Sequence, residues 1–133
     1  MRVVCLISGG GSNLQALIDW QTKGLLGDAE IVGVVSNKVN AFGLERAKKA
    51  GISGSHLSHH DYTDRLEFDQ ALIKVIDGYQ PDLVVLAGFM RILTSEFVNH
   101  YADRLINIHP SLLPKYKGLH THRRAIEAGD ATA

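Results

Sequence analysis

The sequence has little of what marks several large classes of protein. Its single cysteine excludes a disulfide bond within the chain. Lysine and arginine (14) balance aspartate and glutamate (14), so no overall positive field would attract nucleic acid or an anionic membrane. The apolar N-terminal run breaks at Gly9, without a basic leader and far short of the ~20 residues of a membrane helix. These absences predict a cytoplasmic protein that binds neither nucleic acid nor a membrane, and any anion must be bound locally.

Short apolar runs alternate with segments of helical period, and neither a low-complexity linker nor a convincing repeat divides the 133 residues. Strands are predicted at 2–8, 30–36, 55–58, 82–88 and 104–109, with helices between them. The first strand contains Cys5, which we expect to be a buried structural thiol. The pattern predicts one α/β domain over 1–133, an open, doubly wound, Rossmann-like parallel sheet of about five strands with helices on both faces.

The expected strand order 3-2-1-4-5 indicates where a ligand would bind. Ligands of such sheets lie at the carboxyl ends of the strands, beside the point where the strand order reverses. The loops after strands 1, 4 and 5 should therefore meet there.

The segment ISGGGSN leads from the first strand into a helix. In this setting the backbone N–H groups of Gly11, Ser12 and Asn13 can point at an anion that the helix dipole also favours. The alternative is a tight turn in which Ser12 and Gln15 form a capping box. Leu14 replaces the third glycine of a dinucleotide fingerprint, and the G-K-[ST] ending of a P-loop is missing. The loop therefore predicts a site for one phosphate group.

Asn107 and His109 lie two residues apart in the last predicted strand. Their side chains should share one face, while Ile106 and Ile108 take the other. A carboxamide and an imidazole placed this way can stabilise an oxyanion and donate or move a proton. The alternative is a polar strand end whose side chains only bond to neighbouring loops.

The segment GFMRIL places one cation, Arg91, among apolar side chains. Such a slot suits a flat heteroaromatic ligand, although a hydrophobic approach to a helix with a solvated arginine is the alternative. No metal is expected. His109, His120 and His122 lack the cysteine or carboxylate spacings of zinc sites, and residues 59–61 are expected to form a solvated loop with a helix cap.

Four segments, in this order and at these spacings, carry a specific resemblance: ISGGGSNLQALID, SNKVNAFGLERAKKAGI, PDLVVLAGFMRIL and INIHPSLLPKYKGLHTH. Along essentially all 133 residues the sequence resembles the N-terminal portion of the phosphoribosylglycinamide formyltransferase family, the folate-dependent transformylases of purine synthesis. The resemblance implies transfer of a formyl group from 10-formyltetrahydrofolate, the co-substrate, to the amine of glycinamide ribonucleotide, with no metal.

The resemblance also implies roles for particular residues. The 5′-phosphate of the ribonucleotide would be held by Gly11, Ser12 and Asn13. The folate pocket would be lined by Met90, Arg91, Ile92 and Leu93, with Arg65 placed for the glutamate tail. Two members of the family's catalytic trio would be Asn107 and His109.

Members of that family run on past residue 133, and their third catalytic residue, an aspartate, lies in the continuation. We therefore expect this chain alone to bind phosphate-bearing ligands weakly, to show negligible formyl transfer and to self-associate. The alternatives are a non-catalytic nucleotide-binding half-domain, a formyltetrahydrofolate hydrolase or a relative of methionyl-tRNA formyltransferase. The neutral composition counts against the tRNA-binding relative.

Overall fold

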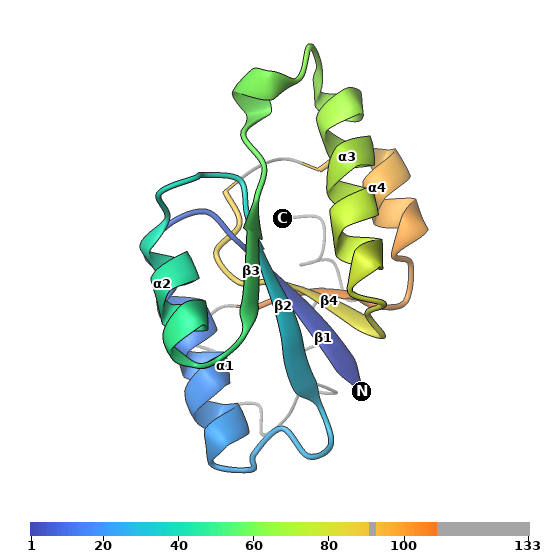
Figure 1. Ribbon diagram of the computed structural model, residues 1–133. Helices are drawn as coiled ribbons and strands as arrows, with labels where there is room; N and C mark the ends of the chain where they lie inside the picture. Colours follow the sequence, from blue (N-terminus) through green and yellow to red (C-terminus); the bar gives the residue numbers. More distant parts are fainter. Residues whose placement is uncertain (91–92, 109–133) are drawn as a thin grey trace.

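The computed structural model describes residues 1–90 and 93–108, over which strands and helices alternate (Figure 1). The strands are β1 (Arg2–Ile7), β2 (Glu30–Ser36), β3 (Ser53–His56), β4 (Leu83–Leu86) and β5 (Leu105–Asn107). The helices are α1 (Ser12–Thr22), α2 (Phe42–Lys49), α3 (Arg65–Gly78) and α4 (Ser95–His100), with a 3₁₀ turn, η1, at His59–Asp61. In the part of the chain covered by these ranges, no helix is both long and apolar enough to cross a membrane.

The five strands form one parallel sheet in the order β3-β2-β1-β4-β5, which confirms the predicted topology. The central strand, β1, pairs with β2 on one edge and with β4 on the other. The chain therefore winds outward in opposite directions from β1. The carboxyl ends of β1 and β4 lie side by side at the point where the strand order reverses.

Helices cover both faces of the sheet, as predicted: α1 and α2 lie on one face, and α3 and α4 lie on the other (Figure 1). Side chains of β1 alternate between the two layers because successive strand residues point to opposite faces. Val3, Cys5 and Ile7 join the core beneath α1 and α2. Val4 and Leu6 join the core beneath α3 and α4. The central strand is thus buried on both sides, as its uninterrupted apolar run indicates.

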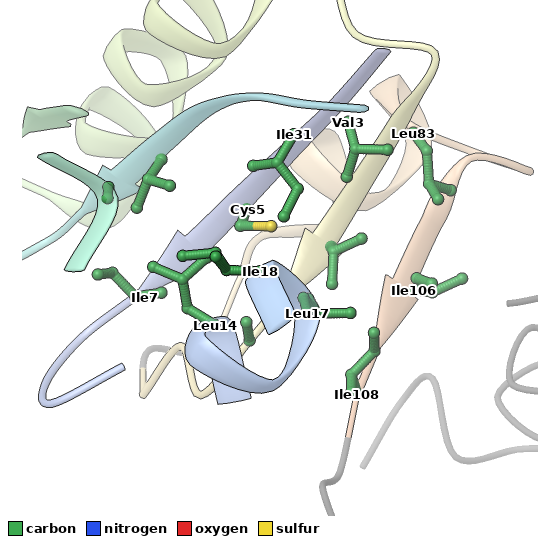
Figure 2. Packing of buried hydrophobic residues seen from close by; sticks show 14 of the residues in the cluster. Val3, Cys5, Ile7, Leu14, Leu17, Ile18, Ile31, Leu83, Ile106 and Ile108 are labelled. Carbon is green, nitrogen blue, oxygen red and sulfur yellow. The ribbon is translucent and has the colours of Figure 1, made fainter. Parts of the chain in front are cut away.

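The α1 side of the sheet shows how the sequence pattern becomes packing (Figure 2). Leu14, Leu17 and Ile18 recur at helical spacing and turn one face of α1 onto the strands. Each fully buried side chain of this size contributes about 1.5–3 kcal/mol to stability. Cys5 lies in this core, fully buried, and burial raises the pKa of its thiol to about 12. The prediction of a buried cysteine is confirmed.

Two local signals in the sequence mark the start of α3 and the end of α2. The Asp64 carboxylate accepts a hydrogen bond from the Glu67 backbone N–H at 2.7 Å, which satisfies one of the unpaired donors of the first turn of α3. Helix α2 is followed by Gly51 with φ +75°, the left-handed conformation that suits glycine after a helix.

The expectations for the third strand and for the segment after β4 differ from the structure. The third strand lies at Ser53–His56 instead of 55–58, because pairing with β2 fixes its position and its own sequence is polar. Helix α4 had no sequence prediction. It has six residues, too few for a visible helical period, and it starts where the Thr94 hydroxyl accepts from the Phe97 N–H at 3.3 Å.

Candidate active site

The loops that leave β1, β4 and β5 meet at the carboxyl edge of the sheet, as the topology predicts. The side-chain amide of Asn13 donates to the Ile108 carbonyl at 3.2 Å, which ties the glycine loop to the end of β5. The Met90 backbone N–H donates to the hydroxyl of Ser8 at 2.7 Å, which ties the loop after β4 to the end of β1. Ser8 is buried and has no sequence signal beyond its place after an apolar strand.

A cavity of about 160 Å³ opens between the glycine loop and the loop after β4. Its lining residues are small or uncharged: Gly9, Gly10, Gly11, Ser12, Asn13, Ala87, Gly88 and Met90. No carboxylate stands among them to repel an anion. The three residues predicted to hold a phosphate therefore lie together on this cavity, with Met90 of the predicted folate loop across from them.

The glycine loop enters α1 through Gly11, which is the N-terminal cap residue of the helix and has a φ of +78°. The Gln15 N–H donates to the Gly11 carbonyl at 2.7 Å and closes the first turn. No side chain caps α1, so the capping box between Ser12 and Gln15 is wrong; the Gln15 amide instead donates to Asp19 at 2.9 Å. Among the described residues, no acceptor is bonded to the N–H groups of Ser12 and Asn13. These donors are available to an anion.

Helix α2 packs against the back of the glycine loop, a contact that the sequence analysis did not anticipate. The Gly43 N–H donates to the Gly9 carbonyl at 3.0 Å, and the Arg46 guanidinium donates from Nε to the Gly10 carbonyl at 2.7 Å. A β-carbon added at Gly11 would lie 2.7 Å from the Gly43 Cα. Glycine at position 11 is therefore required by the close approach of two backbone segments.

In β5 the side chains alternate as predicted. Ile106 and Ile108 are buried in the core beneath α1 and α2. Asn107 lies between them, so its side chain takes the opposite face, and it pairs with Leu86 in the parallel register. Asn107 is half-buried. The next residue is Ile108, whose carbonyl accepts the hydrogen bond from Asn13. His109, predicted beside it, lies outside the described residues.

The predicted folate-binding residues are only partly described. Met90 is 80% exposed at the rim of the cavity, where its side chain is accessible to a ligand. Leu93 packs against the core beneath α3 and α4. Arg91 and Ile92 lie outside the described residues. Arg65 is the exposed first residue of α3 and does not line the cavity.

One buried carboxylate that sequence reasoning missed anchors the chain just after the predicted folate loop. Asp69 of α3 is fully buried, and its Oδ2 accepts from the Thr94 N–H at 2.8 Å. The contact holds the start of α4 against α3, so the segment that leaves β4 is fixed at both of its described ends, by Ser8 and by Asp69. An aspartate inside an apolar helix face is the signal that could have pointed to it.

Metal-ligating groups do not gather in the described part of the chain. Within residues 1–90 and 93–108, no three His, Cys, Asp or Glu side chains are arranged to hold a metal ion. His109, His120 and His122 lie outside these ranges. Residues 59–61 form the turn η1 ahead of α3.

A five-stranded, doubly wound sheet with a glycine-rich loop at its switch point is an architecture shared by many nucleotide-handling proteins, and comparison with known proteins narrows the class of this chain. The family model described as "Formyl transferase" matches residues 1–133, the whole chain. The chain belongs to the formyl transferase family.

The relatives of the chain include phosphoribosylglycinamide formyltransferases and trifunctional purine biosynthetic proteins. The chain is 59% identical over 131 residues to the phosphoribosylglycinamide formyltransferase of Escherichia coli. That alignment covers 98% of this chain and 61% of the E. coli protein. The chain is 48% identical to the human trifunctional purine biosynthetic protein adenosine-3, over 96% of this chain and 13% of that protein.

Solved structures give the same result. The phosphoribosylglycinamide formyltransferase of Coxiella burnetii aligns with a TM-score of 0.78 at 53% identity, over 97% of this chain and 60% of that one. Glycinamide ribonucleotide transformylase 1 of Symbiobacterium toebii aligns with the same TM-score at 41% identity. The chain thus spans about three fifths of the length of the single-function relatives it matches.

Proposed function

We propose that this chain forms the nucleotide-binding portion of a phosphoribosylglycinamide formyltransferase. In this proposal a formyl group moves from N10 of 10-formyltetrahydrofolate to the primary amine of glycinamide ribonucleotide. The carbon–nitrogen bond to the folate breaks, a new one forms to the amine, and the proton lost by the amine ends on the folate nitrogen. The identity to the E. coli enzyme supports the choice of substrates.

The observation that carries the proposal is the hydrogen bond between the Asn13 side chain and the Ile108 carbonyl. It joins the loop proposed to bind phosphate to the strand that carries Asn107. A ribonucleotide whose phosphate lies against Gly11, Ser12 and Asn13 would extend its amine along this edge of the sheet. The substrate is thereby oriented before the reaction, which removes part of its entropic cost.

Each proposed role follows from the chemistry of the groups. The N–H donors of Ser12 and Asn13 would bind the phosphate, and none of the described residues that line the cavity is a carboxylate that would oppose it. The Asn107 amide would donate to the formyl oxygen as negative charge develops there. His109 would hold or move the proton of the amine.

The folate would lie over the loop after β4. The exposed side chain of Met90 provides apolar surface for the flat pterin ring, and the bond from its N–H to Ser8 fixes the backbone beneath it. Arg91, Ile92 and Leu93 are proposed to complete this pocket, and Arg65 to bind the glutamate tail.

The test is formation of formylated ribonucleotide from 10-formyltetrahydrofolate by this chain joined to the C-terminal remainder of the E. coli relative. Asn107→Ala should lower turnover by about 10²–10³, the usual effect of losing one oxyanion donor, with little change in substrate binding. Asn99→Ala, an exposed asparagine on α4, is the matched control and should leave turnover unchanged. Release of free formate instead of formylated ribonucleotide would point to a hydrolase. Near-normal turnover in the Asn107 variant would refute its role.

A further inference from the structure

Two carbonyl groups of the glycine loop are held by α2. The Gly9 carbonyl accepts from the Gly43 N–H at 3.0 Å, and the Gly10 carbonyl accepts from Arg46 Nε at 2.7 Å. Glycine has the widest range of backbone conformations, so a run of three glycines would otherwise sample many orientations of its peptide planes. Each of these two bonds fixes one plane.

The consequence for the N–H groups follows from the geometry of the peptide bond. All peptide bonds in the described chain are trans, so within each plane the C=O and the following N–H point in opposite directions. Because α2 draws the carbonyls of Gly9 and Gly10 toward itself, the N–H groups of Gly10 and Gly11 are directed away from α2. The cavity is lined by Gly10 and Gly11 and by no residue of α2, as expected if these N–H groups face it.

Arg46 is itself fixed by two further contacts. Its Nη1 donates to the side-chain oxygen of Gln15 at 3.1 Å, and its guanidinium carbon lies 4.9 Å from the centroid of the Phe42 ring. The side chain is half-buried, so its charge is less screened than that of a fully exposed arginine. Gln15 belongs to α1, so the Arg46 guanidinium links the glycine loop to both α1 and α2.

We propose that Arg46 is a positioning residue for the phosphate site: it holds the Gly10 carbonyl so that the loop presents its N–H groups to the anion, and its charge raises the affinity further. The inference rests on the proposed function, because it takes the glycine loop as the phosphate site. Arg46 does not touch the ligand in this arrangement and acts through the backbone.

The experiment titrates the ¹⁵N-labelled chain with ribose 5-phosphate and follows the backbone amide signals of the glycine loop. Arg46→Met keeps an unbranched stem and removes the donor and the charge, so we expect roughly tenfold weaker binding, the scale of one charge-assisted hydrogen bond. The Gly10 and Gly11 amide signals should also shift in the free protein. Arg46→Lys, which can still donate to the carbonyl, should recover part of the affinity.

Lys49→Met is the matched control. Lys49 is exposed on the same helix, and its removal deletes one positive charge with no bond to the loop. It should change the affinity by less than about twofold. Arg46→Gln provides a second variant, and the amide spectrum of each variant shows whether it is folded.

The outcomes separate the two ideas. If ribose 5-phosphate leaves the loop signals of the unchanged chain unmoved, the proposed phosphate site fails and the role of Arg46 fails with it. If the unchanged chain binds at the loop but Arg46→Met and Arg46→Gln bind equally well, only the positioning role is overturned. If Lys49→Met weakens binding as much as Arg46→Met, the effect is one of general charge and the proposed geometry is wrong.

Discussion

Replacement of Gly11 by alanine tests the contact between the glycine loop and α2. Two penalties are expected. Alanine at φ +78° is held in the left-handed region, at a cost of about 1–2 kcal/mol. Its β-carbon would also lie 2.7 Å from the Gly43 Cα, a backbone atom that cannot rotate away, and such overpacking costs about 1–3 kcal/mol. The free energy of unfolding should therefore fall by about 2–5 kcal/mol.

Gly51→Ala isolates the steric part of this effect. Gly51 has nearly the same φ, +75°, but an added β-carbon there meets no atom within 4 Å. Both variants stiffen the unfolded chain equally, so that contribution cancels in the comparison. Gly51→Ala should cost only about 1–2 kcal/mol, which leaves a difference of about 1–3 kcal/mol between the variants.

The assay is urea denaturation of both variants followed by circular dichroism, with the slope of each transition checked for constancy. Gly11→Ala should also weaken ribose 5-phosphate binding, whereas Gly51→Ala should not. Equal stability of the two variants would show that the loop can move away from α2 without cost, and would refute the argument that the Gly11–Gly43 approach fixes the loop.

Two further predictions concern residues outside the candidate site. Asp64→Ala removes the cap of α3 and should lower the free energy of unfolding by about 0.5–2 kcal/mol. Asp64→Asn can still accept from the Glu67 N–H and should retain most of the stability. Equal losses of stability in thermal melts of the two variants would contradict the role of Asp64 as a cap. The Cys5 thiol should resist a thiol-specific disulfide reagent at pH 8 in the folded chain and react at once in denaturant. Since its pKa rises from 9.0 to about 12 on folding, the unfolded thiol loses its proton first, and stability should fall as the pH increases from about 9 toward 12.

The parts of the fold that sequence predicts are those governed by local rules. The parallel sheet with helices on both faces follows from the alternation of apolar runs with helical segments. The ends of α2 and α3 follow from Gly51 and Asp64, whose preferences act within a few residues. The meeting of the loops after β1, β4 and β5 follows from topology alone.

The contacts that fix the site depend instead on residues far apart in the chain. Arg46 bonds to a carbonyl 36 residues away, and Ser8 accepts from an N–H 82 residues away. When a side chain bonds to a backbone group, the partner position shows no sequence signal, because almost every residue type carries that backbone group. Helix α4 escaped prediction for a related reason, since six residues are held by packing and by Thr94 more than by their own periodicity.

The central position of β1 has a consequence for the order in which the molecule can assemble during synthesis. Strand β1 is made before β2 and pairs with it soon afterwards, but its other edge waits for β4, whose last paired residue is Leu86. At roughly 5–20 residues per second, the ribosome leaves that edge open for several seconds after β2 is complete. Until α3 is made, Val4 and Leu6 also lack its cover. The nascent chain is thus most exposed to aggregation through its own centre, and a pause in translation between β2 and β4 would lengthen that exposure.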